Sequence, residues 1–429
     1  MKNAPIGAIG RLAPQPWMTS PETKSLFEAL EAGGKQARFI GGCVRNAIFS
    51  IPVKDIDIAT PEPPQKVMEL LEAANINAIP TAVKYGTVTA IINSIHYEIT
   101  TLRIDVENHG RQATIAYTDD WVADAQRRDF TINTISTTID GDIFDPLTGM
   151  DDLKQRWVRF VGSARERIEE DLLRLLRFFR FQATFGGSSL DQDAISACRF
   201  LAPRLRELSA ERIQSELFKI LEAPNPANTM VLMNSELVLK HVLPEAKNFE
   251  RLRMLTWLET NFINTETIKP DKLRRLAAML NTEKTGHTAL ANRLRLSKKQ
   301  CSRLATMTNS SLYPVPELNH LNRHQALYDF GVDNFRDLVL LSWAQEKTIE
   351  LHQPPQRTKD WLGLINEVDT WQKPTFPIKG RDAKKLGLKQ GPAVGEAIKR
   401  VEAWWRDGDF KADKKQCMSQ LKQVIANQL

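Results

Sequence analysis

The stretch FIGGCVRN, residues 39–46, followed by KDIDIAT, residues 54–60, decides the fold of the N-terminal part of the chain. Each segment contains an apolar run of strand length, and Gly41-Gly42 comes directly after the first run. Glycines at such a position allow backbone N–H groups to approach a phosphate closely, and Arg45 would face the same anion. Most Gly-Gly pairs are only turns, so this step needs support from a second feature.

The second feature is the pair Asp55 and Asp57. Side chains at positions i and i+2 of a strand point to one face, so these carboxylates would lie close together while Ile56 and Ile58 enter the core. Hard oxygen ligands at this spacing suit Mg²⁺ that bridges nucleotide phosphates. A half-buried strand with a polar outer face is the commoner explanation of an Asp-x-Asp alone. The glycine step before it reverses that preference and predicts a metal site.

A third carboxylate, Glu98, lies in YEITTLR, residues 97–103, which alternates as a strand does. From a neighbouring strand it would reach the same metals, and in a two-metal site a third acid helps to orient the ion that activates the attacking hydroxyl. Taken alone, Glu98 is an ordinary surface residue.

Two further segments are rich in arginine. Arg127 and Arg128 stand beside Asp129 and would form a fixed fork for phosphate or ribose, although a salt-bridged helix cap explains them equally well.

In residues 167–181 we expect one helix, on which charged side chains recur every three residues and form a stripe in apolar surroundings. A solvated helix face is the alternative, but such a stripe is costly unless it has an anionic partner. The members of the stripe are Asp171, Arg174, Arg177 and Arg180.

The pattern along the chain predicts an α+β protein: a small mixed sheet backed by helices, followed by a mainly helical remainder from Ser163 onward. Asn93-Ser94 and Asp140-Gly141 are candidate hairpin turns, and the polar segment between Arg103 and Asp120 is expected to be a long loop. The predicted strands are Ala37–Ile40, Val53–Ala59, Thr87–Ile92, Ile95–Leu102 and Ile132–Ile139.

Composition excludes several classes of protein. A chain of 429 residues with 42% hydrophobic and 26% charged residues has ample core for about three domains. No apolar run is long enough to span a membrane, and four scattered cysteines fit no disulfide framework, so we expect a soluble protein in a reducing, cytoplasmic setting. All the excess positive charge lies in residues 379–429, with 12 Lys or Arg against 6 Asp or Glu. Such a surface attracts polyanions such as nucleic acid, although a solvated charged face is the commoner explanation of this bias.

These motifs together resemble the class II tRNA nucleotidyltransferases, or CCA-adding enzymes, and the related bacterial poly(A) polymerases. The resemblance extends through ERIQSEL, residues 211–217, which is similar to a stabilising helix of that family. It implies a polymerase-β-like nucleotidyltransferase head, residues 1–153, and a neck for base recognition, residues 154–245. A helical body, residues 246–360, and a basic tail that grips tRNA, residues 361–429, would follow.

The resemblance also implies roles for individual residues. Asp55 and Asp57 would hold Mg²⁺ in a two-metal site, with Glu98 as a third catalytic acid, and Asp171 and Arg174 would face the incoming base. The residues implied in nucleotide binding are Gly41, Gly42, Arg45, Arg127, Arg128, Asp129, Asp171, Arg174, Arg177 and Arg180. One position departs from the family pattern, because Asn46 stands where an aspartate is usual beside Arg45.

Base choice can be argued from hydrogen-bond inventories. Cytosine and adenine each present an amine donor beside a ring-nitrogen acceptor, whereas uracil and guanine present the transposed pair. A carboxylate only accepts and a guanidinium only donates, so Asp171 beside Arg174 would select C and A without a template.

The implied reaction adds C, C and A to the 3′ end of tRNA from CTP and ATP, with release of pyrophosphate. Poly(A) synthesis, CC-only or A-only addition and, less favoured, a non-catalytic RNA-binding role are the alternatives. The segment between Arg103 and Asp120 is similar to the long loop of members that add all three nucleotides. The sequence leaves the oligomeric state open.

Overall fold

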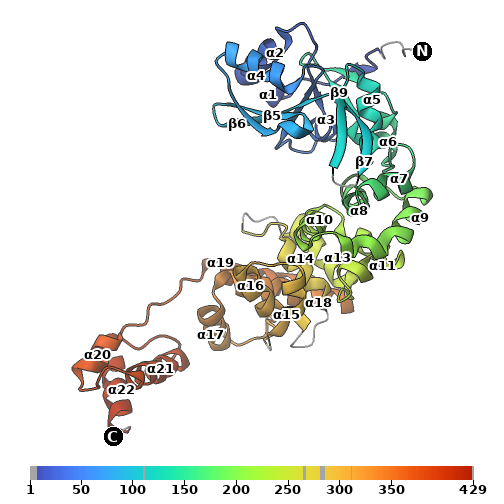
Figure 1. Ribbon diagram of the computed structural model, residues 1–429. Coiled ribbons are helices and arrows are strands. Elements are labelled where there is room, and N and C mark those ends of the chain that lie inside the picture. The colour runs from blue at the N-terminus through green and yellow to red at the C-terminus, as the bar shows by residue number, and fades with distance from the viewer. Residues whose placement is uncertain (1–6, 110–111, 264–266, 281–285, 311, 428–429) are drawn as a thin grey trace. The chain divides into compact units, whose positions relative to one another are not determined.

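The computed structural model describes residues 7–109, 112–263, 267–280, 286–310 and 312–427. The chain divides into two compact units, Met1–Pro244 and Glu245–Leu429 (Figure 1). The first unit holds all the strands of the described residues, and the second is helical. The predicted α+β class is therefore confirmed, whereas the finer division into four domains stays a prediction.

An eight-stranded mixed sheet forms the centre of the first unit, in the order β1-β10-β9-β2-β3-β6-β5-β4. Within it β3 runs antiparallel to β2 and parallel to β6. Ile58 and Ile99 of β3 and β6 are fully buried, as their alternation with polar residues predicts. The strands are β1 (Gly10–Arg11), β2 (Arg38–Ile40), β3 (Ile56–Thr60), β4 (Asn77–Ala82), β5 (Thr87–Ile92), β6 (Ile95–Thr101), β9 (Ser136–Thr137) and β10 (Asp142–Phe144).

Two expected elements differ in the structure. The strand expected over Ile132–Ile139 is wrong in its first half, because Thr131–Asn133 forms a 3₁₀ turn. The hydroxyl of Thr131 donates to Asp152 at 2.5 Å and the amide of Asn133 donates to Asp129 at 2.8 Å, and these bonds favour a turn over a ladder.

The long loop expected between Arg103 and Asp120 is also wrong. Most of that segment forms an antiparallel pair, β7 (Arg103–His109) with β8 (Gln112–Tyr117). β-branched and aromatic residues such as Ile104 and Tyr117 favour strands, and the polar residues between them hid that signal.

Twelve helices of the described residues complete the first unit. Gly149 begins α6 close to the 3₁₀ turn, where an added Cβ would lie 2.3 Å from the carbonyl oxygen of Thr131, so this contact requires glycine. The helices are α1 (Pro16–Thr19), α2 (Pro21–Glu31), α3 (Gly42–Ile48), α4 (Pro64–Ala73), α5 (Trp121–Gln126), α6 (Gly149–Gln155), α7 (Ala164–Glu170), α8 (Leu173–Phe185), α9 (Gln192–Leu201), α10 (Ala210–Glu222), α11 (Pro226–Ser235) and α12 (Leu239–Val242).

The second unit consists of further helices, and its last three pack on a small apolar core that contains Trp405, while Trp404 remains 39% exposed. Among the described residues, every helix is too short or too polar to cross a bilayer. The helices are α13 (Phe249–Trp257), α14 (Lys272–Met279), α15 (Gly286–Arg293), α16 (Lys298–Asn309), α17 (His320–Phe330), α18 (Val332–Ile349), α19 (Pro355–Thr370), α20 (Gly380–Lys385), α21 (Pro392–Asp407) and α22 (Lys414–Ala426).

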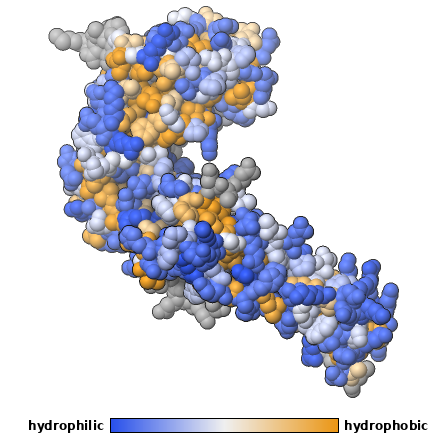
Figure 2. All heavy atoms as spheres, turned by 180° about the vertical axis from the view of Figure 1, so that it is seen from behind, coloured by the Kyte–Doolittle hydropathy of each residue, from blue (hydrophilic) through white to orange (hydrophobic). Residues whose placement is uncertain are grey.

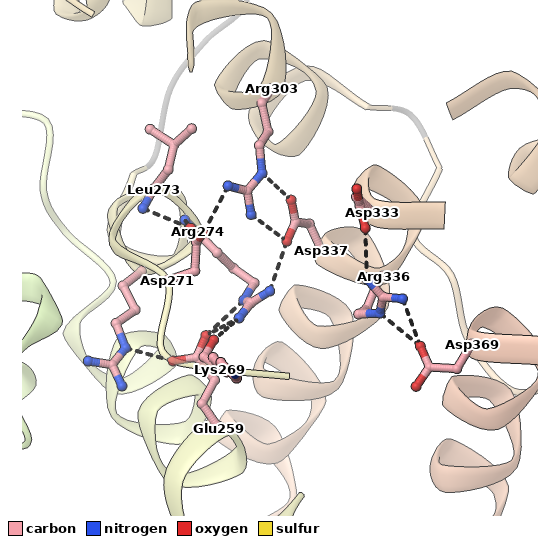
Figure 3. Close-up of polar contacts among 11 residues, drawn as sticks. Glu259, Lys269, Asp271, Leu273, Arg274, Arg303, Asp333, Arg336, Asp337 and Asp369 are labelled. Carbon is pink, nitrogen blue, oxygen red and sulfur yellow. Dashed lines mark hydrogen bonds and ion pairs between the residues drawn. The ribbon is translucent and has the colours of Figure 1, made fainter. Parts of the chain in front are cut away.

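A buried network of charges joins α14, α16 and α18 in this unit, as Figure 3 shows. Asp337 accepts hydrogen bonds from Arg274 at 2.9 Å and from Arg303 at 2.7 Å. Arg274 also donates to Glu259 at 2.8 Å, and Arg303 to Asp271 at 2.9 Å. Because these charges are paired with one another, removal of Asp337 leaves two guanidinium groups with one carboxylate partner fewer in buried surroundings.

We expect Asp337→Ala to lower the free energy of unfolding by about 3–5 kcal/mol, because two guanidinium groups lose their shared carboxylate. Urea unfolding of the full chain measures the effect. Asp333→Ala is the matched control on the same helix: its side chain is 91% exposed and pairs with Arg336 at 2.9 Å. Because the Asp333 carboxylate is in solvent, this pair should contribute less than about 1 kcal/mol. Equal losses for both variants would contradict the interpretation.

Candidate active site

Three carboxylates meet where β3 lies beside β6. The parallel register places Asp57 opposite Glu98, and Asp55 lies in the bend just before β3. The strand expected from Val53 is therefore too long at its start, although the two aspartates still flank Ile56, which is buried. Asp55 and Glu98 are exposed and Asp57 is half-buried.

The neighbours of Asp57 make its charge costly. Burial, followed by the charge of Glu98, raises the pKa of Asp57 to about 6, and Asp55 adds to this shift. Arg128 and Arg45 oppose the shift without cancelling it. A crowded set of hard oxygen donors whose mutual repulsion raises a pKa is suited to a divalent cation such as Mg²⁺. The residues present therefore fit the metal that the sequence predicts.

The glycine step lies against these acids. Gly41 has φ +71°, a conformation that glycine adopts readily, and α3 begins at the next residue. A Cβ on Gly42 would lie 3.8 Å from Oδ2 of Asp57 and 3.9 Å from Nη2 of Arg45. Gly42 is thus next to both a metal-ligand candidate and a cationic side chain.

Arg45 is 8% exposed and is held by two amides. Oδ1 of Asn46 accepts from its Nη2 at 2.9 Å, and Oδ1 of Asn133 accepts from its Nη1. Burial, with the nearby charge of Arg180, lowers the pKa of Arg45 to about 10. Asn46 therefore supplies the acceptor that the usual aspartate would supply, but leaves the positive charge uncancelled. A buried cation with neutral acceptors attracts an anion.

An open cavity of about 690 Å³ in the first unit is lined by some of these residues, among them Arg45, Asp55 and Asp57. Its far wall comes from α8 and α10, so the sheet and the helical segment that follows it both contribute to the site. The charged residues and glycine of the lining include Gly42, Arg45, Lys54, Asp55, Asp57, Arg180, Lys219 and Glu222.

A single buried carboxylate positions Arg127 and Arg128. Oδ1 of Asp124 accepts from Arg127 at 2.6 Å, and Oδ2 accepts from Arg128 at 2.8 Å. Although burial acts to raise it, the pKa of Asp124 is lowered, because these two guanidinium groups favour the charged form. Nη1 of Arg128 lies 3.7 Å from the place that a Cβ of Gly41 would occupy. The structure thus brings Arg128 to the glycine step, in an orientation that Asp124 fixes.

Asp129 is buried, and its carboxylate accepts hydrogen bonds from three groups. It accepts from Arg177 at 2.7 Å, from the Asn133 amide at 2.8 Å and from the backbone of Phe130 at 2.9 Å. These donors and the charge of Arg177 lower the pKa of Asp129 against the opposing effect of burial. Asp129 therefore positions Arg177 and the 3₁₀ turn.

The continuous helix expected over residues 167–181 is wrong, because the chain leaves the helix at Asp171. α7 ends at Glu170 and α8 begins at Leu173, with Asp171 in extended backbone. Oδ1 of Asp171 accepts from the backbone N–H of Leu173 at 3.1 Å. Aspartate before a helix start commonly satisfies such an N–H group, which explains the break.

The arginine stripe has anionic partners inside the protein. Arg174 pairs with Glu170, Arg177 with Asp129 and Arg180 with Glu216 at 2.9 Å. Ion pairs with the chain's own carboxylates thereby offset the desolvation penalty of these arginines.

Asp171 is paired with Arg212, whose Nη2 lies 3.0 Å from both carboxylate oxygens. Arg212 and Glu216 are four residues apart on α10, so they lie on one helix face and contact two members of the stripe.

Salt bridges of Arg127 and Arg128, which the sequence allowed, are present, and Asp124 is their partner at i+3 and i+4. Sequence reasoning did not identify four other partners, namely Asn133, Glu170, Arg212 and Glu216. Arg212 pairs with Asp171 and Glu216 with Arg180 across two helices, and no local sequence pattern indicates these pairs.

Comparison with known proteins shows which family the chain matches. Residues 37–159 match the Poly A polymerase head domain family, and residues 188–250 match the family described as probable RNA and SrmB-binding site of polymerase A. A mouse protein named CCA tRNA nucleotidyltransferase 1, mitochondrial, is 31% identical over 95% of this chain and 93% of its own length. The CCA-adding enzyme of Streptococcus gordonii is 29% identical over 91% of this chain and 94% of its own.

Solved structures share the fold. The Bacillus stearothermophilus CCA-adding enzyme in complex with CTP has a TM-score of 0.76 at 24% identity, covering 96% of this chain and 99% of that one. A Thermotoga maritima CCA-adding enzyme complexed with tRNA has a TM-score of 0.61 at 20% identity, covering 94% of each chain. Together with the near full-length relatives, these matches confirm the resemblance that the motifs indicated. The chain belongs to the family of the CCA tRNA nucleotidyltransferases.

Proposed function

We propose that this protein adds C, C and A to the 3′ end of tRNA, using CTP and ATP and releasing pyrophosphate. The observation that carries the proposal is the register of β3 and β6, which places Asp57 opposite Glu98 beside the glycine step and Arg45. The names of relatives that match nearly the whole chain support tRNA as substrate. Solved relatives complexed with CTP, ATP and tRNA support these three as ligands.

Asp55 and Asp57 would hold Mg²⁺, with Glu98 as a third acid. When bound, the metal supplies charge neutralisation at the phosphates and activation of the attacking hydroxyl. The terminal 3′ hydroxyl of the RNA attacks the α-phosphate, and pyrophosphate leaves. Gly42 gives the triphosphate close access to the backbone, and Arg45 binds its negative charge. Arg128, held by Asp124, approaches the same triphosphate from the side of Gly41.

Arg127, Asp129 and Arg177 would complete the nucleotide site toward phosphate and ribose, with Arg180 at the wall of the cavity. Asp171 accepts from the exocyclic amine of C or A, and Arg174 donates to the ring nitrogen. Guanine and uracil present the transposed groups, and each mispaired buried group costs about 1–3 kcal/mol. Selection of the base then requires no nucleic-acid template.

The basic C-terminal segment would bind tRNA by phosphate charge and shape. This segment, at the lower right of Figure 2, presents a mostly hydrophilic surface on the face shown. The cytoplasmic setting stays a prediction, because the relatives include bacterial enzymes and proteins named as mitochondrial.

The direct test is incubation of the purified protein with tRNA that lacks its last three nucleotides, in the presence of labelled CTP or ATP. We expect incorporation of two C residues from CTP alone and of a single A after them when ATP is added. Long A tracts without C incorporation would show a poly(A) polymerase instead, and absence of any incorporation would support a non-catalytic RNA-binding role.

Asp57→Asn removes one metal-ligand charge while keeping the size of the side chain. We expect nucleotide incorporation to fall by about a thousandfold, because several kcal/mol of transition-state stabilisation depend on the metal. Asp119→Asn is the control, since that side chain is 69% exposed and pairs only at the surface with Lys35. An Asp57→Asn variant with unchanged incorporation and unchanged thermal unfolding would show that the metal site is elsewhere.

Arg174→Ala tests base selection. Loss of the guanidinium should raise incorporation of G and U relative to C and A by about 10–100-fold, with much smaller change in tRNA affinity. Arg165→Ala, on the preceding helix with a side chain 59% exposed, serves as the control. Weaker tRNA binding with unchanged base choice would argue for a role in RNA contact alone. The assay is single-nucleotide addition with each of the four triphosphates.

A further inference from the structure

Two histidines and an aspartate meet in the second unit, outside the nucleotidyltransferase site. His320 and His324 lie one turn apart on α17, and Asp409 lies in the turn between α21 and α22. Nδ1 of His324 is 3.1 Å from Oδ1 of Asp409, and Nδ1 of His320 is 3.9 Å from Oδ2. One nitrogen or oxygen atom of each side chain lies within 4.8 Å of the other two.

The fold holds these groups together. The imidazole centroids are 3.7 Å apart, as i, i+4 spacing on a helix permits. Asp409 has φ +55°, which aspartate tolerates better than most residues, so the turn directs its carboxylate at the histidines. Phe410, the next residue, packs against Tyr328 of α17 at 5.1 Å and against Trp405 at 5.0 Å. Apolar packing thus fixes the turn against α17 independently of the polar groups.

A second carboxylate supports the arrangement from α19. Oε1 of Glu367 lies 3.7 Å from Nε2 of His324, on the side of the ring opposite to Asp409. This oxygen is buried and has no hydrogen-bond partner within the described residues. Histidines that bind a metal usually donate their other ring N–H to a carboxylate, which fixes the tautomer. Glu367 is placed to accept that proton after a small movement of the side chain.

We propose that His320, His324 and Asp409 bind one divalent transition-metal ion, with Zn²⁺ as the best match. Two imidazole nitrogens and one carboxylate oxygen suit zinc better than Mg²⁺, which prefers oxygen ligands alone. Zinc bonds of about 2.0–2.1 Å place tetrahedral ligand atoms roughly 3.3 Å apart. The histidine nitrogens lie 3.1 and 3.9 Å from the carboxylate oxygens of Asp409, so a small movement of His320 brings the ligands to that spacing. Water would complete the coordination, because His320 is 59% exposed.

Bound metal would fasten the turn between α21 and α22 to α17. Lys411, whose Nζ lies 3.2 Å from Oδ2 of Asp409 and whose side chain is 80% exposed, competes for that carboxylate. Oδ1 remains directed at His324, so the lysine moderates the affinity without closing the site. The inference stands apart from the proposed function, because none of these residues belongs to the first unit.

The test uses the full chain carrying Asp55→Asn and Asp57→Asn, which removes the other candidate metal site. After treatment with a chelator, Co²⁺ is added and its visible absorption is followed, and Zn²⁺ is then used to displace it. We expect one equivalent of Co²⁺ with the intense absorption of a four-coordinate ion. Hydrogen exchange of residues 406–411 and 320–324 should slow when Zn²⁺ is bound.

His320→Ala and His324→Ala should each weaken Zn²⁺ affinity at least tenfold, while His352→Ala, an exposed histidine of the same unit, should leave it unchanged. Asp409→Asn, which tolerates the same backbone conformation, should weaken binding and retain the fold. The proposal would be overturned if the histidine variants bound Zn²⁺ as tightly as the parent. It would also be overturned if Zn²⁺ slowed hydrogen exchange elsewhere in the chain but not in these two segments. The absence of four-coordinate Co²⁺ absorption would overturn it as well.

Discussion

The parallel pairing of β3 with β6 is the constraint on which the rest of the site depends. It sets Asp57 opposite Glu98 while the alternate residues, Ile58 and Ile99, fill the core. Because side chains alternate along a strand, a shift of register by one residue would turn an acid into the core and an isoleucine to the surface. The apolar core therefore fixes the positions of the acids, although the acids repel one another.

Around these acids, the cationic side chains are each held by a fixed acceptor. Asp124 orients Arg127 and Arg128, Asp129 orients Arg177, and amide oxygens hold Arg45. Side chains that are already ordered lose little conformational entropy when a nucleotide arrives. This explains why so many charged groups are buried here: their partners pre-organise the site at the cost of desolvation, and the nucleotide meets a formed surface.

Several strands and the grouping of the acids could be predicted from the local sequence pattern. Alternation located β5 and β6, and the Asn93-Ser94 turn between them is confirmed by positive φ at both residues. The proximity of the acids could be predicted, because the alternation of side chains along a strand follows from the local sequence alone. The pairing of Arg212 with Asp171 and of Glu216 with Arg180 could not be predicted, since it depends on packing between α8 and α10. The break at Asp171 was missed because the charged stripe continues across it in the sequence. The β7–β8 pair was missed because polar residues interrupt its alternation.

The pairing of Asp171 has one more consequence. Its carboxylate accepts two contacts from Arg212 and one from the N–H of Leu173, which uses three of roughly four lone-pair directions. The remaining direction can receive a single amine hydrogen while the other three contacts persist. Arg212 would then hold this carboxylate in one orientation, so that in the proposed base selection the incoming base meets a single open lone pair of Asp171.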